Sequence, residues 1–271
     1  MRIDGEPSVL SIGEGGFTLI EMLVSAAIGL IVLGVMFGAV AVQGRSAASQ
    51  LGLADAQQTG RNLGELLRQD MRLAGYGMLG VPKAANLPPL AYSTTGATSS
   101  LVLRGAFSNA VTTLALAAAA GSRTLVVAPP AEGSFVVGER VLVDSGLYSE
   151  VHMISGVSAS GGQLSLGMDA PLTRAYPSGP SVTQIEDVTY SLTGGLLMRN
   201  AMVLADEVES VNLDFVGQDG TTTDFPGDDL RGIVLDLMVA QPDALPDSEP
   251  SHTRLRTEVQ VRNLAFRQGV G

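Results

Sequence analysis

A long uncharged stretch near the N-terminus is the strongest constraint on what this chain can fold into. Between Met22 and Val42 there is no charged residue, and Ser25 is the only strongly polar side chain. About 20 residues of helix span the ~30 Å hydrocarbon core of a bilayer, and a signal peptide's apolar region is shorter, roughly 7–15 residues. We therefore expect a retained membrane helix. The alternative is a buried helix in the core of a soluble domain.

A carboxylate, Glu21, stands at the edge of this stretch. A carboxylate in a membrane helix is unfavourable by about 2.5–3.5 kcal/mol on insertion scales, so it needs a cationic partner. A free α-amino group at Phe17, made by a cut after Gly16, would provide that partner on the same chain or on a neighbouring one.

The residues around Glu21 resemble the processing motif of type IV prepilins and of type II secretion pseudopilins. They read Gly16-Phe17-Thr18-Leu19-Ile20-Glu21, followed by Met22-Leu23-Val24. The resemblance implies that prepilin peptidase, an inner-membrane aspartyl peptidase, cuts after Gly16 and N-methylates Phe17. It also implies that Glu21 pairs with the amino terminus of an adjacent subunit and sets the register of assembly.

Residues 1–16 would then be a leader peptide, and their charge departs from the family pattern. Family leaders are usually short and basic, whereas this one has Arg2 against Asp4, Glu6 and Glu14. Its removal leaves 15 of the 16 basic residues and 24 of the 27 acidic residues. The mature chain therefore stays acidic, which argues against a nucleic-acid surface because phosphate binding needs clustered Lys and Arg.

Four small residues in the apolar stretch have the spacing of helix-packing motifs. Ser25 and Gly29 are four residues apart, and so are Gly34 and Gly38. Such pairs let helix backbones approach closely inside a membrane or filament core. The alternative is that these glycines reflect how common Gly is in membrane helices.

Helical periodicity continues beyond the apolar stretch. Apolar residues recur on one face at Leu63, Leu66, Leu67, Met71 and Ala74, before Gly75-Tyr76-Gly77 ends the pattern. We expect one long helix with a transmembrane half, residues 17–42, and a periplasmic half, residues 43–76. We also expect four glycines to kink or loosen it: Gly44, Gly52, Gly60 and Gly64.

The end of this helix resembles a narrower group, the PilW-type minor pilins. Residues 69–76 read Gln69-Asp70-Met71-Arg72-Leu73-Ala74-Gly75-Tyr76, and that group commonly has a Leu-rich segment ending in Asp-(Met/Leu)-Arg-x-Ala-Gly-Tyr. Four later runs look like the C-terminal strands of PilW and GspJ proteins: residues 188–192, 197–199, 204–215 and 257–264.

Residues 77–271 have the pattern of a β-rich domain, because β-branched runs alternate with turn residues. The expected strands are 101–104, 124–128, 135–144, 149–155, 163–167, 183–192, 208–216, 233–240 and 257–266. We interpret residues 120–176 as a small inserted β module. No helices alternate with these strands, so the expected fold class is α+β: a pilin-like fold, with the long N-terminal helix packed on an antiparallel sheet.

Residue types needed for catalysis or metal binding are sparse. The chain has no cysteine, and His152 and His252 lie far apart without metal-ligand spacing. We therefore expect no catalytic residue, no cofactor, no metal and no small-molecule substrate. The acidic residues 214–229 lack EF-hand spacing, so a solvated loop is expected, with a Ca²⁺ site as the alternative. Four C-terminal arginines are interpreted as surface charges: Arg254, Arg256, Arg262 and Arg267.

These observations favour a structural subunit over an enzyme. The first hypothesis is a PilW-like minor pilin, held in the inner membrane by a single pass with a periplasmic C-terminal domain, that takes part in type IV pilus assembly. The second is a GspJ-like pseudopilin of a type II secretion system. A third is a membrane-anchored binding domain or enzyme, and the acidic charge disfavours a fourth, a DNA-uptake pilin. The expected partners are prepilin peptidase, other minor and major pilins or pseudopilins, and the inner membrane.

Overall fold

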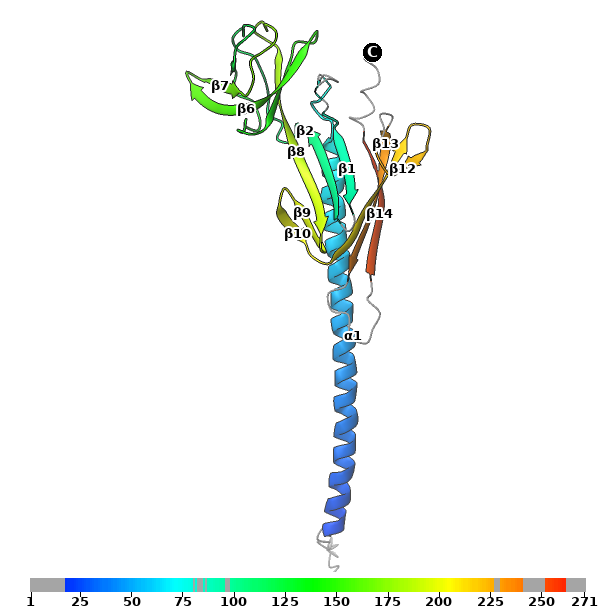
Figure 1. The fold of residues 1–271 in the computed structure, drawn as a ribbon. Helices are drawn as coiled ribbons and strands as arrows, with labels where there is room; N and C mark the ends of the chain where they lie inside the picture. The colour runs from blue at the N-terminus through cyan, green and yellow to red at the C-terminus, as the bar shows by residue number, and fades with distance from the viewer. Residues whose placement is uncertain are drawn as a thin grey trace, which may run out of the picture. The chain divides into compact units, whose positions relative to one another are not determined.

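The computed structural model describes residues 18–79, 81, 85, 87–95, 98–226, 230–240 and 252–261. The chain divides into two units, residues 1–51 and 52–271. The helix α1 (Leu19–Leu73) contributes to both units, and the described strands lie in the second (Figure 1). The predicted fold class is confirmed, because an apolar N-terminal helix packs against antiparallel sheets in a pilin-like α+β architecture.

The helix α1 is continuous over 55 residues. An acidic residue, Glu21, lies in its first turn and a basic one, Arg72, in its last, which suits the helix dipole at both ends. The helix ends at Leu73, slightly before the predicted end at residues 74–76. Gly75 follows with φ +80°, a left-handed conformation that glycine adopts without strain and that commonly ends helices.

Two of the glycines that were expected to kink or loosen α1, Gly60 and Gly64, pack against strands, and the kink itself stays a prediction. Eight residues of one helix face are buried: Gly52, Ala56, Gly60, Leu63, Gly64, Leu67, Asp70 and Met71. A Cβ on Gly64 would collide with the Leu255 side chain, and a Cβ on Gly60 would lie 3.9 Å from Val239 Cγ2. These glycines bring the helix close to the strands that carry Val239 and Leu255.

The two packed glycines predict different outcomes for the same substitution. Glycine in a helix interior is unfavourable by about 1 kcal/mol relative to alanine. We expect Gly60→Ala to stabilise the domain by about 0.5–1 kcal/mol, because its methyl group meets only ordinary contacts. Gly64→Ala brings the same gain in helix propensity, but its methyl group must displace the Leu255 side chain, so the net stabilisation is smaller. Urea denaturation of the detergent-solubilised chain measures both, and equal stabilisation would contradict the close approach at Gly64.

The first sheet has ten antiparallel strands. Its main order is β1-β2-β8-β5-β6-β7-β4, with β3 and β9 pairing β8, and β10 pairing β9. The strands are β1 (Leu90–Thr95), β2 (Thr98–Gly105), β3 (Val111–Thr113), β4 (Thr124–Val127), β5 (Arg140–Asp144), β6 (Ser149–Ser160), β7 (Gln163–Met168), β8 (Ser181–Thr193), β9 (Leu196–Arg199) and β10 (Met202–Ala205). The long strand β8 joins two parts, since it pairs with β2 and β9 at one end and with β3 and β5 at the other.

The second sheet has four strands in the order β12-β11-β13-β14. They are β11 (Val208–Gly217), β12 (Thr222–Thr223), β13 (Leu230–Ala240) and β14 (His252–Gln260). The strand β14 begins five residues earlier than the predicted strand, and its exposed and less exposed residues alternate. Residues 262–266 of the predicted strand lie outside the described residues.

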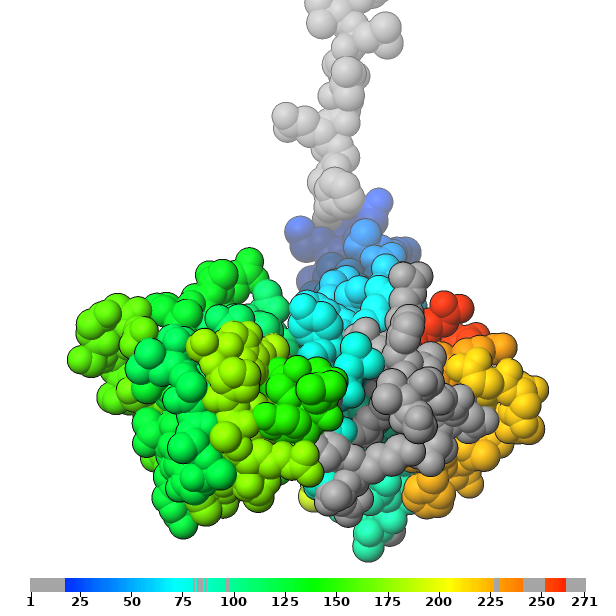
Figure 2. Space-filling model, turned by 90° about the horizontal axis from the view of Figure 1, so that it is seen from above, coloured from blue at the N-terminus to red at the C-terminus, as the bar shows by residue number. Residues whose placement is uncertain are grey.

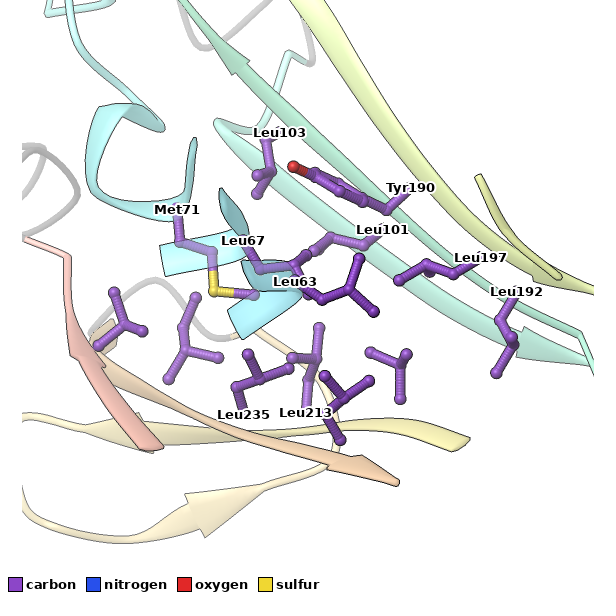
Figure 3. Packing of buried hydrophobic residues seen from close by; sticks show 14 of the residues in the cluster. Leu63, Leu67, Met71, Leu101, Leu103, Tyr190, Leu192, Leu197, Leu213 and Leu235 are labelled. Atoms are coloured by element: carbon purple, nitrogen blue, oxygen red, sulfur yellow. The ribbon is translucent and has the colours of Figure 1, made fainter. Parts of the chain in front are cut away.

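The main core lies between the two sheets and holds the C-terminal part of α1. In Figure 3, Leu63, Leu67 and Met71 of the helix point into a cluster that both sheets complete. The first sheet contributes Leu101, Leu103, Tyr190, Leu192 and Leu197, and the second contributes Leu213 and Leu235. The rings of Tyr92 in the first sheet and Phe215 in the second pack against each other, with their centroids 5.7 Å apart.

A second core forms within residues 114–182, around β4 to β7 and the first part of β8. A small third cluster packs Met78 and Val81, which follow α1, against Leu142 and Ile185. In both overall views, the green strands around the second core lie on one side and the orange part of the second sheet lies on the other (Figures 1 and 2). We call residues 114–182 the β module. That it is an insertion, with the bounds 120–176, stays a prediction.

Candidate functional site

Thr18 stands directly before α1 and caps its first turn. The N–H of Glu21 lies 3.0 Å from the Thr18 carbonyl oxygen and 3.3 Å from the Thr18 hydroxyl oxygen. Thr with Glu three residues later is the capping-box pattern, in which the two side chains satisfy free N–H groups at a helix start. Thr18 therefore defines where α1 begins and holds Glu21 in the first turn. This role was not predicted, although the Thr-x-x-Glu spacing is its signal.

The processing positions predicted from the sequence, Gly16 and Phe17, lie outside the described residues, and so does the predicted leader, residues 1–16. Glu21 is described, and it is exposed in the first turn of α1. Its part in setting assembly register, like cleavage at Gly16 and methylation of Phe17, stays a prediction.

Large apolar side chains cover the start of α1 and are exposed. From Leu19 to Val42 they leave between 51% and 79% of their surface exposed. The helix is long and apolar enough to cross a membrane by length and composition, and nothing in its most apolar window is buried by the chain itself. Burial of this surface must therefore come from lipid or from other protein chains.

The four small residues predicted to pack helices have free space around them. A Cβ on Gly29, Gly34 or Gly38 would meet no atom within 4 Å, and Ser25 is exposed. At about 100° per residue, Ser25 and Gly29 share one helix face, and Gly34 and Gly38 share a face roughly 180° away. The four residues thus form two pairs on opposite faces of the helix, and their part in helix packing stays a prediction.

A buried polar cluster ties α1 to the first sheet. Asp70 is only 4% exposed, and its Oδ2 accepts hydrogen bonds from the Tyr190 hydroxyl at 2.6 Å and from Arg199 Nε at 2.8 Å. Burial, reinforced by the hydrogen bond to Asp70, raises the pKa of Tyr190, so the hydroxyl stays a neutral donor. These two partners lie on β8 and β9 and were not predicted.

The residues that follow α1 join its end to β2. The Gly75 N–H donates to the Arg104 carbonyl at 2.7 Å, and the Ala106 N–H donates to the Tyr76 carbonyl at 2.9 Å. Gly105 lies between them, where a Cβ would be 2.7 Å from the Leu73 carbonyl oxygen. Residues 70–76 and 104–106 therefore build the joint between helix and sheet.

Charged side chains of β2, β5 and β8 form an ion-pair network. Asp187 accepts from Arg104 Nε at 3.3 Å and from Arg140 Nη1 at 2.8 Å. Burial, followed by the charges of Glu186 and Asp187, raises the pKa of Glu139. A raised pKa is also found at catalytic acids, but here the neighbouring carboxylate is held by two arginines of the same sheet.

Two arginines near the C-terminus pair with aspartates of the same sheet. On β14, Arg254 binds Asp236, and Arg256 Nη2 lies 3.8 Å from Asp214 Oδ2. Asp219 accepts from the Thr221 backbone and hydroxyl. Among the described residues, no three His, Asp or Glu side chains are grouped so that they could hold a metal ion. Four members of the two predicted groups lie outside the described residues: Asp228, Asp229, Arg262 and Arg267.

A comparison with protein-family models matches residues 13–37 to the prokaryotic N-terminal methylation motif. This match includes the predicted cleavage junction together with Thr18 and Glu21. No curated protein and no solved structure matches the chain.

The class that the helix and this motif define is a membrane-anchored precursor with an extracytoplasmic domain. Residues 13–37 thus carry the N-terminal methylation motif found in type IV prepilin-like proteins, the pilin and pseudopilin family, and the α+β fold is pilin-like. Members of that family are typically structural subunits, and the motif implies processing by prepilin peptidase.

Proposed function

We propose that the chain is a minor pilin of the PilW type, which takes part in type IV pilus assembly as a structural subunit. This proposal rests on one observation. The methylation motif at residues 13–37 overlaps the start of an exposed apolar helix, and the same helix continues into an α+β domain. The sequence resemblance of residues 69–76 to the PilW-type pilins supports the narrower assignment.

Cleavage by prepilin peptidase would create a positively charged amino group close to the start of α1. Prepilin peptidase would cut between Gly16 and Phe17 and methylate the new amino group of Phe17. That amino group would lie within a few residues of Glu21, which Thr18 holds in the first turn. An ammonium beside a carboxylate offsets the penalty of a charge at the edge of the membrane, on this chain or across to a neighbour.

Assembly would move α1 from lipid to protein surroundings. Before assembly, the protein would span the inner membrane once, with its β-rich domain in the periplasm. In the filament, the exposed apolar surface would pack against helices of other minor and major pilins. The opposite faces at Ser25–Gly29 and Gly34–Gly38 have room for two close neighbours.

Glu21→Gln is expected to reduce incorporation into filaments about tenfold or more, because the charge pair with the amino terminus is lost. The amount of protein in the inner membrane should stay unchanged. The measurement is an immunoblot of sheared filaments against the membrane fraction. Glu65→Gln is the matched control, since Glu65 lies on α1 in an exposed ion pair with Arg68. Equal incorporation of both variants would contradict a role for Glu21 in assembly.

Deletion of the gene, with complementation, tests the function itself. Loss of surface filaments, counted by electron microscopy, is the outcome expected for a minor pilin. Intact filaments with loss of type II secretion into the medium would indicate a GspJ-like pseudopilin instead. If both activities persist, the protein is a membrane-anchored binding domain or enzyme, and the proposal is overturned.

A further inference from the structure

The strand β14 forms one edge of the second sheet. Its residues pair with β13 in an unbroken antiparallel register from His252 to Gln260. In an antiparallel edge strand, alternate residues direct their N–H and C=O groups away from the neighbouring strand. Among the described residues, no backbone hydrogen bond other than those of the β13 pairing uses the backbone of β14. The outer side of β14 therefore offers a row of backbone donors and acceptors to a further strand.

The features that usually protect an edge strand are missing from β14. Natural edges are blocked by proline, by bulges, by unpaired charges or by being very short. The strand has nine residues without proline, and its register with β13 has no shift. Its arginines are engaged within the sheet, since Arg254 binds Asp236 and Arg256 Nη2 lies 3.8 Å from Asp214 Oδ2. The edge is thus available for pairing.

The side chains of β14 that face α1 are only partly covered. Thr253, Leu255 and Thr257 alternate with exposed residues and are each half-buried. The helix lies directly against this row, because a Cβ on Gly64 would collide with Leu255 and Arg68 Nη2 donates to Thr257 Oγ1 at 3.0 Å. A strand added to the outer edge of β14 would therefore extend the sheet along the flank of α1 and cover the row.

The flank of α1 beside this edge carries an exposed positive charge. Successive helix residues are rotated by about 100°, so Arg68 is turned about 80° from Gly60 and Arg61 about 20° further. Gly60 faces β13 and Arg68 reaches β14, so Arg61 lies on the side of the helix beyond β14. Arg68 also binds Glu65, whereas no ion pair between described residues includes Arg61, which is exposed. An added strand would meet this charge.

We propose that the edge of β14 binds an extended, acidic segment of another polypeptide, which adds a strand to the second sheet. Backbone hydrogen bonds to β14 provide the affinity, and side chains at alternate positions provide the selectivity. Those on the inner face of the added strand cover Leu255 and lie beside Arg61. Charge complementarity at Arg61 therefore favours acidic residues at these positions and disfavours basic ones.

A peptide array probed with the detergent-solubilised full chain tests this proposal. The peptides are about eight residues long, which matches β14, and alternate threonine with glutamate, glutamine or lysine. We expect the glutamate peptides to bind about fivefold or more tightly than the lysine peptides. Two N-methylated forms of the glutamate peptide separate strand pairing from charge attraction. Methylation of one alternate set of backbone N–H groups should abolish binding and methylation of the other should not, because only one set faces β14.

A charge reversal on α1 tests the predicted position of the added strand. Arg61→Glu should weaken binding of the glutamate peptide by about fivefold or more. Arg45→Glu is the matched control and should bind as the native chain does, because Arg45 is an exposed arginine of the same helix that precedes its buried residues.

The other outcomes overturn the proposal. They are an absence of binding by every peptide, an equal loss with both N-methylated forms, and an equal loss in the two arginine variants. Binding that appears only in a chain ending at Val261 would place residues 262–271 of the chain itself on the edge. Binding that appears only when the protein is diluted would place a second copy there. Either result would replace the acidic partner as the occupant.

Discussion

Asp70→Ala should destabilise the domain by about 3 kcal/mol, because removal of one partner from a buried charge pair destabilises proteins by about 3–5 kcal/mol. The substitution leaves the buried Tyr190 hydroxyl and the largely buried Arg199 guanidinium without their shared acceptor. Both partners sit on the first sheet, so the substitution also removes the polar link between α1 and that sheet. In a domain of this size, the melting temperature should fall by about 6–12 °C.

Thermal unfolding of the detergent-solubilised chain, followed by circular dichroism, measures this effect. Glu65→Ala is the matched control, because it removes a carboxylate from the same helix but from an exposed pair, which typically contributes less than about 1 kcal/mol. Tyr190→Phe should lie between the two, since it removes one hydrogen bond and leaves the ion pair. If Asp70→Ala melts no lower than Glu65→Ala, the polar cluster does not secure the helix.

Gly105→Ala should also destabilise strongly, by about 2–4 kcal/mol, from overpacking together with lost hydrogen bonds. Its Cβ would lie 2.7 Å from the Leu73 carbonyl oxygen and 3.4 Å from that of Tyr76. Both are backbone atoms, so neither can rotate away as a side chain would. The hydrogen bonds from Gly75 to Arg104 and from Ala106 to Tyr76 must then lengthen or break.

Gly156→Ala is the control for that prediction. Gly156 is also a strand glycine, on β6, but a Cβ there would meet no atom within 4 Å. Urea denaturation should show a loss at position 105 and little change at 156. Equal midpoints for the two variants would contradict the close contact between β2 and the end of α1.

Local patterns in the sequence were sufficient to predict α1 and most strands. The signals for α1 come from residues that lie close together in the sequence. They are the apolar run, the helical period up to Met71, and Gly75, which ends the helix in a left-handed conformation. Residues 197–199 were interpreted as a strand-like run, but the hairpin that joins β9 to β10 was not predicted. Its turn places Asn200 and Ala201 at φ 49° and 65°, and alanine gives no signal for a left-handed conformation.

Long-range contacts could not be predicted in this way. Asp70 meets Tyr190 and Arg199, which lie 120 and 129 positions away in the sequence. No spacing rule connects such residues, because the pairing of β8 with β2 and β9 brings them to the helix. The close packing of Gly60 and Gly64 was not predicted for a similar reason: whether a helical glycine admits a neighbouring strand depends on the strand.

Mass spectrometry of the N-terminal peptide tests the central claim most directly. The protein is expressed in its own membranes, with the prepilin peptidase present or deleted. We predict a peptide that begins at Phe17 and carries one added methyl group, seen only when the peptidase is present. A peptide that still contains Gly16 and begins at Met1 in both strains would contradict the account, and the protein would then be a membrane-anchored domain that is not processed as a prepilin.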